Sequence, residues 1–384
     1  MSSTRTSRAS ELIALLVREG YIRAEPPILQ PASIFLDLSG EDLRRRMFLT
    51  TDADGQELCL RPDLTIPTAR LHLEQEKGGK EAAYCYLGPV FRHREQGRSE
   101  FPQAGIEIFG RADREAADAE VMARAAEAVD LYGVNDPDIR LGDRALLAAF
   151  VDDLEIPQVW RRRILRDAQR EIGLGVDLAT LSQPANGATD HSGFLAALDG
   201  ADPKAAKAVV EDLLSIAGIS QVGGRTASDI AERFLEQARL RASAALPPST
   251  HEALTNFFAI GGNPVTALAQ IRNLIVDSRL SGALTAAGED SSLREALDRF
   301  ERRLELLAGR GLRVEEMMFS TAFGRRLDYY TGLVFEFRAP EKGDLGPLVG
   351  GGRYDGLLGT LGAPKPVPAV GCAIWIERLE EAAR

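Results

Sequence analysis

The stretch GRRLDYYTGLVFEF, residues 324–337, decides the fold of this chain, and GGGRYDG follows it at residues 350–356. Its second half, residues 333–337, is rich in β-branched and aromatic residues and is bounded by a glycine, which is typical of a β-strand. Its first half is a cluster of arginine, aspartate and tyrosine. The pattern predicts a strand that begins directly after a group of polar side chains.

Other strand signals occur in the first third of the chain. Two apolar runs around Asp54-Gly55 predict a β-hairpin, because glycine supplies the positive φ that the turn requires. Residues 83–92 and 101–109 predict a second, longer hairpin, in which Gln103 and Glu107 lie four residues apart and therefore point to the same face. We expect an antiparallel sheet in this part of the chain.

Helix signals lie around these strands. A first helix is predicted from Ser10 to Gly20, where an apolar run has helical spacing. Asp113 is predicted to cap a second helix that runs to about Tyr132. Both helices have an apolar side that can pack on the predicted sheet.

The middle of the chain has a different character. From about residue 158 to residue 310 nearly the whole sequence is rich in alanine and leucine and helical in pattern, whereas strand signals return after Glu315. We therefore expect an α+β fold in three segments. Residues 1–157 form the first half of a mixed core, residues 158–310 a mostly helical insertion with connecting helices, and residues 311–384 the second half of the core.

Composition narrows the class of protein. A chain of 384 residues, 45% hydrophobic and 27% charged, is typical of a globular protein with two domains or one domain that carries an insertion. The net charge of -11 and the lack of a run of lysine and arginine argue against a nucleic-acid surface.

The cysteines and the N-terminus indicate the compartment. Cys59, Cys85 and Cys372 are too widely spaced for a disulfide framework or a zinc site, so a reducing environment is expected. The N-terminal residues lack the apolar region of a signal peptide, and no apolar run approaches the ~18 residues of a membrane span. We expect a cytoplasmic protein that holds no metal and no cofactor.

A polar set converges on one concavity if the long hairpin and the late strands share a sheet. Carboxylates and a glutamine can hold an ammonium group or a ring N–H, and arginines can grip a carboxylate or a phosphate. The set therefore fits a small zwitterion, and a buried Glu107 beside tyrosine hydroxyls favours a ligand with two N–H donors, such as histidine. The members of the set are Asp63, Thr65, Arg92, Gln103, Glu107, Arg325, Asp328, Tyr329, Tyr330 and Arg353.

Simpler interpretations of these residues stay open from the sequence alone. Arg92 can equally be an ion-pair partner of Glu107, and Tyr329 and Tyr330 can be packing residues. The glycine run at residues 350–352 lacks the spacing of a phosphate-binding loop. The four histidines have no metal-site or triad arrangement, and no pair of nucleophile and base stands out.

Six motifs in order resemble the catalytic core of histidyl-tRNA synthetase, a class II aminoacyl-tRNA synthetase. The resemblance spans nearly the whole chain and includes a helical insertion at the corresponding place. It implies an antiparallel sheet flanked by helices, and a homodimer. The motifs are RPDLT at 61–65, GPVFRH at 88–93, QAGIE at 103–107, LDYYTG at 327–332, GGRYDG at 351–356 and AVGCAIWIERL at 369–379.

The resemblance also implies roles for single residues. Arg92 and Arg378 match the arginines that hold ATP phosphates, and with Arg94 they are candidates for a vestigial ATP site. Arg325 matches the arginine that assists activation of the amino acid. The candidates for a histidine pocket are Asp63, Thr65, Gln103, Glu107, Arg325, Tyr329 and Tyr330.

The chain departs from the synthetase pattern at three places. The sequence ends six residues after Arg378, so we expect no C-terminal anticodon-binding domain. The second class II motif places a glutamate, which accepts from the adenine amino group, where this chain has the donor Arg94. Losing that hydrogen bond should make the binding of adenine less favourable by on the order of 1–3 kcal/mol. Arg326 stands where the synthetases usually have glycine, so a side chain is expected beside the site.

With these departures, the chain resembles the regulatory subunits of ATP phosphoribosyltransferase. This resemblance implies no catalytic residues and a partnership with the short-form catalytic subunit, in an assembly similar to a hetero-octamer built on dimers. It implies a role in the first step of histidine biosynthesis, where the chain is needed for full activity and for feedback inhibition by L-histidine, without tRNA. Two other hypotheses are a truncated synthetase-like ligase that forms histidyl-adenylate and a free-standing histidine-binding module.

Overall fold

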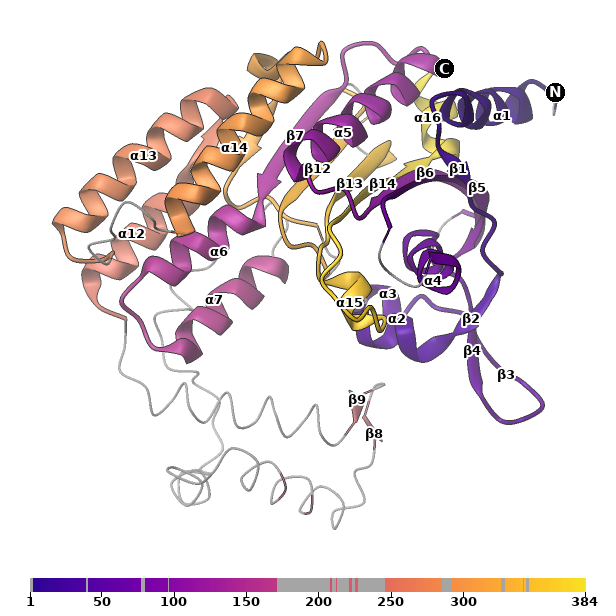
Figure 1. Ribbon diagram of the computed structural model, residues 1–384, viewed down its shortest axis with the longest axis horizontal. Helices are drawn as coiled ribbons and strands as arrows, with labels where there is room; N and C mark the ends of the chain where they lie inside the picture. Colours follow the sequence, from indigo (N-terminus) through magenta and orange to yellow (C-terminus); the bar gives the residue numbers. More distant parts are fainter. Residues whose placement is uncertain are drawn as a thin grey trace.

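The central feature of the fold is a nine-stranded β-sheet (Figure 1). The computed structural model describes residues 3–38, 41–76, 80–95, 97–170, 246–284, 292–325, 329–340, 342 and 345–384, together with 208, 212, 221–222 and 225–226. The strands in spatial order are β1 (Ile22–Arg23), β5 (Ala82–Phe91), β6 (Glu100–Phe109), β14 (Ala369–Trp375), β13 (Val349–Arg353), β12 (Leu333–Arg338), β7 (Asp138–Asp143), β11 (Met318–Ser320) and β10 (Gly261–Gly262).

Strand pairing brings the two ends of the chain together. Neighbouring strands are antiparallel, except that β1 runs parallel to β5 and β11 parallel to β7. The β5–β6 hairpin is the predicted one, and β6 then pairs with β14, which sets Glu107 opposite Gly371. The pairing of β12 with β13 sets Glu336 opposite Gly350. Early and late motifs therefore share one sheet, and the predicted α+β class is confirmed.

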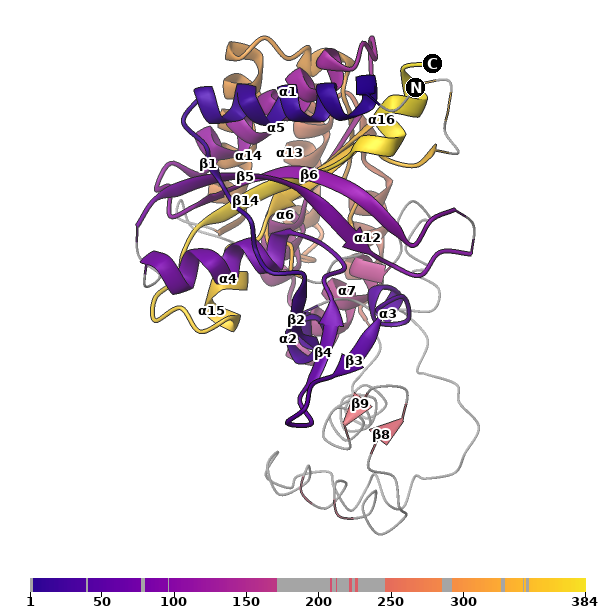
Figure 2. The same cartoon turned by 90° about the vertical axis from the view of Figure 1, so that its right-hand side faces the viewer.

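Helices cover both faces of the sheet, which is seen nearly edge-on in Figure 2. On one face lie α1 (Ser3–Arg18) and α5 (Arg114–Leu131), over the larger hydrophobic core. On the other face lie α4 (Thr65–Glu76) and α15 (Leu357–Thr360), over a second core. Beside α4 are α2 (Ala32–Leu38), α3 (Glu41–Arg44) and a small sheet of β2 (Leu29–Pro31), β4 (Glu57–Leu60) and β3 (Leu49–Thr51).

A group of helices lies beside the other end of the sheet (Figure 1). It comprises α6 (Arg144–Asp153), α7 (Gln158–Arg170), α12 (Pro248–Ala259), α13 (Pro264–Leu280) and α14 (Ser292–Gly309). Phe150 of α6 stacks on Phe257 of α12 with ring centroids 4.2 Å apart. Most of residues 171–245 of the predicted insertion lies outside the described residues, apart from the short pair β8 (Gln221–Val222) and β9 (Arg225–Thr226).

Local signals in the sequence agree with the ends of several elements. Asp113 caps α5, and its side chain accepts from the Ala116 N–H at 3.1 Å. Gly55 has a φ of 84° in the turn between β3 and β4, as the hairpin prediction required. The prediction that the first helix begins at Ser10 is wrong, because α1 begins at Ser3 in a polar stretch without apolar periodicity. None of the helices in the described residues is long and apolar enough to cross a membrane.

Candidate functional site

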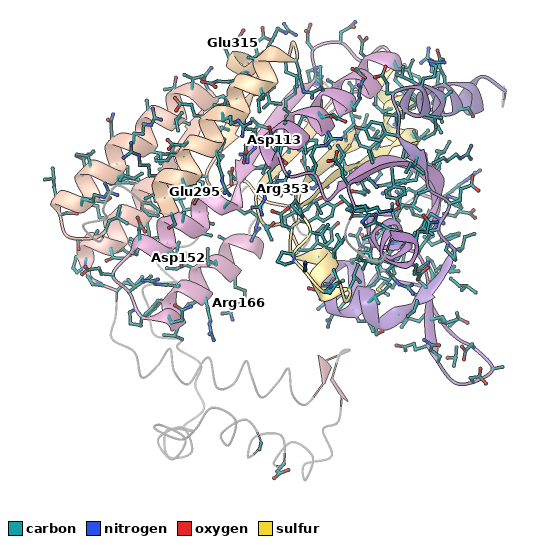
Figure 3. The ribbon with its side chains drawn as sticks, in the orientation of Figure 1. Asp113, Asp152, Arg166, Glu295, Glu315 and Arg353 are labelled. Carbon is teal, nitrogen blue, oxygen red and sulfur yellow. The ribbon has the colours of Figure 1, made fainter. Side chains whose placement is uncertain are left out.

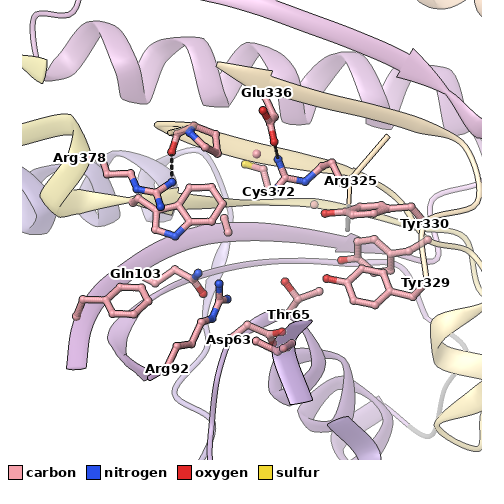
Figure 4. A pocket seen from close by; sticks show the side chains of 18 of the residues that line it. Asp63, Thr65, Arg92, Gln103, Arg325, Tyr329, Tyr330, Glu336, Cys372 and Arg378 are labelled. Atoms are coloured by element: carbon pink, nitrogen blue, oxygen red, sulfur yellow. Dashed lines mark hydrogen bonds and ion pairs between the residues drawn. The ribbon is translucent and has the colours of Figure 1, made fainter. Parts of the chain in front are cut away.

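A cavity of about 280 Å³ opens on the α4 side of the sheet, over β6, β14, β13 and β12 (Figure 4). Its wall also includes the start of α4, the segment directly after β5 and the first turn of α16 (Ile376–Ala382). Nine of the ten residues predicted for the two sites line this cavity, so the structure brings these nine together in space. These nine are Asp63, Thr65, Arg92, Arg94, Gln103, Arg325, Tyr329, Tyr330 and Arg378.

Glycines in the strands make room for the polar groups of this cavity. The Arg325 guanidinium lies against Gly350, where an added Cβ would overlap it. The Glu107 carboxylate lies against Gly371 in the same way. Because any other residue places a Cβ on the sheet surface, these two glycines allow large charged side chains to lie flat over the strands. The glycine run at residues 350–352 therefore allows a side chain to approach the strand closely.

Three buried polar atoms in the cavity wall have no partner in the described part of the chain: Asp63 Oδ2, Gln103 Nε2 and Arg325 Nε. Asp63 Oδ1 accepts from the Ile66 N–H in the first turn of α4. Gln103 Oε1 accepts from the Leu64 N–H at 3.2 Å, which turns the amide nitrogen toward the cavity. One acceptor and two donors therefore await a ligand, since buried polar atoms are rarely left unpaired.

Glu107 lies just behind the cavity wall and is fully buried. Tyr86 donates to Oε1 at 3.0 Å, and the Tyr354 hydroxyl donates to Oε2. Burial raises the pKa of Glu107 from 4.5 to about 8, although the tyrosine hydrogen bonds act against this shift. Tyr354 does line the cavity, and its hydroxyl links the Glu107 carboxyl group to the cavity wall.

Arg325 is fixed by a second buried carboxylate. Its Nη1 donates to Glu336 Oε1 at 2.7 Å, while Arg338 binds the other oxygen of Glu336 through two nitrogens. In Figure 4 this pair lies on the sheet side of the cavity, with Tyr329 and Tyr330 at one end. The rings of Tyr329 and Tyr330 are 5.0 Å apart between centroids, which gives this end an aromatic wall.

The opposite end of the cavity carries most of its positive charge. Arg92 donates from Nε to the Pro62 carbonyl at 2.6 Å, and Arg378 donates from Nη1 to the Pro347 carbonyl at 2.7 Å. Arg94 lies 3.5 Å from the centroid of the Phe101 ring. Burial and the charges of Arg94 and Arg92 lower the pKa of Arg378 to about 10.

Two of the sequence predictions need correction. Arg353 does not face the cavity: its Nε donates to Asp118 at 2.9 Å and its Nη2 to the Arg114 carbonyl on the α5 side, in the interior of the molecule (Figure 3). Because neighbouring residues of a strand point to opposite faces, its adjacency to a lining residue was misleading. Arg92 makes no ion pair with Glu107; burial lowers the pKa of Arg92, and the charge of Asp63 acts against this shift.

Other predictions lie outside what the structure tests. Arg326 and Asp328 fall outside the described residues. Among the described residues, no group of three or more histidine, cysteine, aspartate or glutamate residues could hold a metal ion. The sequence prediction omitted Glu336, Tyr354 and Trp375 from the site. For Glu336 in β12 and Trp375 in β14, the alternation of side chains between the two faces of a strand was the available signal.

A large antiparallel sheet with an amino-acid-sized polar cavity on one face defines a protein of the class II synthetase type. The family model described as Histidyl-tRNA synthetase matches residues 2–236 and 234–379. A solved ATP phosphoribosyltransferase regulatory subunit/histidyl-tRNA synthetase from Bacillus halodurans has a TM-score of 0.67 at 22% identity and covers 99% of this chain and 79% of its own. A histidyl-tRNA synthetase from Nostoc sp. PCC 7120 has a TM-score of 0.64 at 18% identity, over 98% of this chain and 71% of its own. These two similarities show the fold.

Relatives found by sequence identify the family more specifically than the similar solved structures do. The ATP phosphoribosyltransferase regulatory subunit of Brucella canis is 38% identical over 371 residues, 96% of this chain and 94% of that protein. The protein of the same name from Brucella ovis is equally similar. The chain therefore belongs to the histidyl-tRNA synthetase family and, within it, to the ATP phosphoribosyltransferase regulatory subunits. The predicted family is confirmed, and that family bears the name of a regulatory and not of a catalytic subunit.

Proposed function

We propose that this chain binds L-histidine in the cavity and, joined to the short-form catalytic subunit of ATP phosphoribosyltransferase, adjusts the activity of that enzyme to histidine. The observation that carries the proposal is the set of unpartnered atoms in the cavity wall: Asp63 Oδ2, Gln103 Nε2 and Arg325 Nε. An α-amino acid supplies three matching groups, because its ammonium donates and its two carboxylate oxygens accept.

The remaining wall suits an imidazole side chain. With the ammonium group at Asp63 and the carboxylate at Arg325 and Gln103, the side chain of the ligand extends toward the tyrosines. Tyr354 and Tyr330 present hydroxyls and ring faces there, with ring centroids 6.3 Å apart. The Tyr354 hydroxyl donates to Glu107 and keeps its acceptor sites, so an imidazole N–H of the ligand can donate to it. Glu107 accepts from the Tyr354 hydroxyl and so orients that hydroxyl beside the side chain of the ligand.

One residue of the same cavity indicates that the chain does not itself form histidyl-adenylate. Arg94, which takes the place of the adenine-accepting glutamate, is held by an ion pair with Glu377 at 3.6 Å and cannot serve as an acceptor. The alternative ligase reading predicts histidine-dependent exchange of diphosphate into ATP by the purified chain. We expect no such exchange, and a clear signal would replace the regulatory proposal with the ligase.

The assembly we propose is a homodimer of this chain within a hetero-octamer in the cytoplasm, acting in histidine biosynthesis without tRNA. The domain division into residues 1–157, 158–310 and 311–384 is part of the same proposal. It places most of the sheet in two halves around a mostly helical insertion, from which β10 joins the sheet as an edge strand. The relatives that bear the name of a regulatory subunit support a catalytic partner.

The deciding experiment measures formation of phosphoribosyl-ATP by the short catalytic subunit with and without this chain, and with and without histidine. We expect little activity without the chain, full activity with it, and inhibition by histidine. The variant Gln103→Glu keeps the shape of the side chain but loses the donor, so its complex should stay active and become insensitive to histidine. Full activity of the catalytic subunit alone would contradict the regulatory role. Unchanged inhibition in the variant complex would remove histidine from this cavity.

A further inference from the structure

Trp375 stands at the end of a row of small residues in the floor of the cavity. Along β14 the residues Gly371, Ala373 and Trp375 line the cavity, and Gly350 of β13 lies opposite Ala373. Because a strand sends every second side chain to the same face, these three positions of β14 face the ligand together. The small residues leave room for a ligand to lie on the sheet, and the indole of Trp375 ends that room.

The indole also lies between two guanidinium groups of the cavity. Its ring centroid is 5.8 Å from Cζ of Arg325 and 5.0 Å from Cζ of Arg378. In Figure 4 these two arginines lie well apart, with Arg325 beside the tyrosines and Arg378 at the other end of the cavity. A ring this close to both lies between them, so it divides the cavity into a tyrosine side and an arginine side.

Packing fixes the indole in this position. Trp375 is 7% exposed, and its backbone N–H donates to the Leu348 carbonyl at 2.9 Å directly before α16 begins. Its side chain belongs to a small hydrophobic cluster, whose other buried members are Leu64, Tyr86, Val90 and Phe101. Since the interiors of proteins are closely packed, a side chain held by such a cluster moves only at a cost. Trp375 is therefore a fixed wall and not a movable one.

The carboxylate of the proposed ligand lies next to this wall. The proposed function places that carboxylate at Arg325 and Gln103, and both residues neighbour the indole. Gln103 is the partner of Trp375 across the β6–β14 pair, and the Arg325 guanidinium lies over the ring. Side chains that are directly opposite in an antiparallel pair have Cβ atoms only about 5 Å apart. A carboxylate fits beside the indole, whereas a further group attached to it would overlap the ring.

We propose that Trp375 is a specificity-determining residue, which admits α-amino acids with a free carboxyl group and excludes those extended at the carboxyl end, such as N-substituted amides, esters and peptides. The inference rests on the proposed function and deepens it, because the cavity then responds to free histidine and not to histidine joined to another molecule. Specificity of this kind comes from a clash with the wrong ligand. The cavity volume of about 280 Å³ agrees with a small ligand, since ligand pockets usually measure about 300–1,000 Å³.

The test is calorimetric titration of the full chain with four ligands that separate charge from length. L-Histidine has the free carboxylate, and L-histidinamide loses the charge but keeps the length. L-Histidine N-methylamide adds a methyl group to the amide, and L-histidylglycine adds a residue that restores a carboxylate. We expect wild type to bind histidine most tightly and histidinamide more weakly. The N-methylamide should bind at least about tenfold more weakly than histidinamide, and histidylglycine should not bind.

Two variants assign this discrimination to the indole. In Trp375→Ala, which removes the wall, histidinamide and its N-methyl derivative should bind with similar affinity, and histidylglycine should bind measurably. Trp375→Phe is the matched control, because it keeps an aromatic ring at the same place and should keep the preference for histidinamide. Both variants lose the indole, so a difference between them in the ratio of the two amide affinities is not expected from a merely structural role.

The outcomes separate the wall from the site. Absence of histidine binding by wild type contradicts the proposed function and the inference together. Histidine binding by wild type, with equal binding of histidinamide and the N-methylamide, contradicts the inference alone. The inference is also overturned if Trp375→Ala still rejects the N-methylamide or binds neither amide. If Trp375→Ala does not fold by circular dichroism, Trp375→Leu, which keeps more of the packing, takes its place under the same criteria.

Discussion

The carboxylate of Glu107 lies directly against Gly371 of the neighbouring strand, so that a single methyl group at position 371 would overlap it. We expect Gly371→Ala to displace Glu107 and to lower the free energy of unfolding by about 1–3 kcal/mol, the usual cost of overpacking. Histidine binding should fall with it. Urea unfolding measures the first effect and calorimetry the second.

Gly359→Ala is the matched control for this substitution. Gly359 lies in α15 and an added Cβ there meets no atom within 4 Å. Alanine should be neutral or slightly stabilising at that position, since it is a better helix former than glycine. Equal stability of the two variants would mean that the sheet yields at position 371 and that the close contact with Glu107 is not required.

The raised pKa of Glu107 predicts a specific pH dependence. Burial raises this pKa from 4.5 to about 8, so the folded chain holds the proton more tightly than the unfolded chain. Wild type should therefore lose stability as the pH rises from about 5 to 8 and level off above that range. Glu107→Gln cannot ionise, and its Tm should exceed that of wild type by an amount that grows over the same range.

Scanning calorimetry at several pH values measures this difference. Glu305→Gln on the exposed side of α14 controls for the removal of a carboxylate as such. Parallel stability curves for wild type and Glu107→Gln would show that Glu107 is already ionised in the folded chain at pH 5, which would contradict the pKa of about 8.

A substitution of Gln103 gives a prediction about the affinity for histidine and not about stability. Its Nε2 is a buried donor with no partner among the described residues, and its Oε1 is used by the Leu64 N–H. Gln103→Glu keeps the acceptor and replaces the donor by a charge that repels the ligand carboxylate. We expect histidine affinity to fall at least about tenfold, or about 1.4 kcal/mol. Gln158→Glu, on the exposed first residue of α7, should leave affinity unchanged in calorimetric titration.

Turn and cap chemistry made much of the fold predictable from the sequence. Gly55 specifies a turn because it has no side chain, and Asp113 specifies a helix start because its side chain caps the first turn. The structure has both features. Local rules do not report which distant strands pair. The neighbours of β6 include β14, from the far end of the chain, and only the resemblance to synthetases indicated that the two ends share a sheet.

The site was predictable as a set of residues but not as an arrangement. Ordered motifs indicated nine residues that line the cavity, whereas the direction of each side chain depends on strand register. Arg353 and Tyr354 are adjacent in the sequence, but their side chains point to opposite faces of the sheet. Arg353 binds Asp118 and Tyr354 binds Glu107. The position of Arg94 over Phe101 depends on the β5–β6 hairpin and on Glu377 together, which no local pattern encodes.

The buried ion network behind the sheet gives the sharpest prediction about stability. Arg303 of α14 binds Asp118 of α5 at 2.8 Å and Asp143 at 2.7 Å. All three side chains are buried, with 4%, 0% and 3% exposed. Asp118 also accepts from Arg353, whose carbonyl receives the Thr331 N–H beside the tyrosine end of the cavity. The network thus joins the helical side of the molecule to the loop that carries Tyr330.

Arg303→Met should lower the free energy of unfolding by about 3–5 kcal/mol, because it leaves two carboxylates buried with too little positive charge. Another arginine of α14 provides the control. Arg299 is 45% exposed and pairs with the exposed Glu295 on the same helix, so Arg299→Met should cost less than about 1 kcal/mol. Urea unfolding of both variants compares a buried and an exposed arginine on one helix. Similar costs would contradict the prediction, because they would show that the buried network contributes no more to stability than a surface pair.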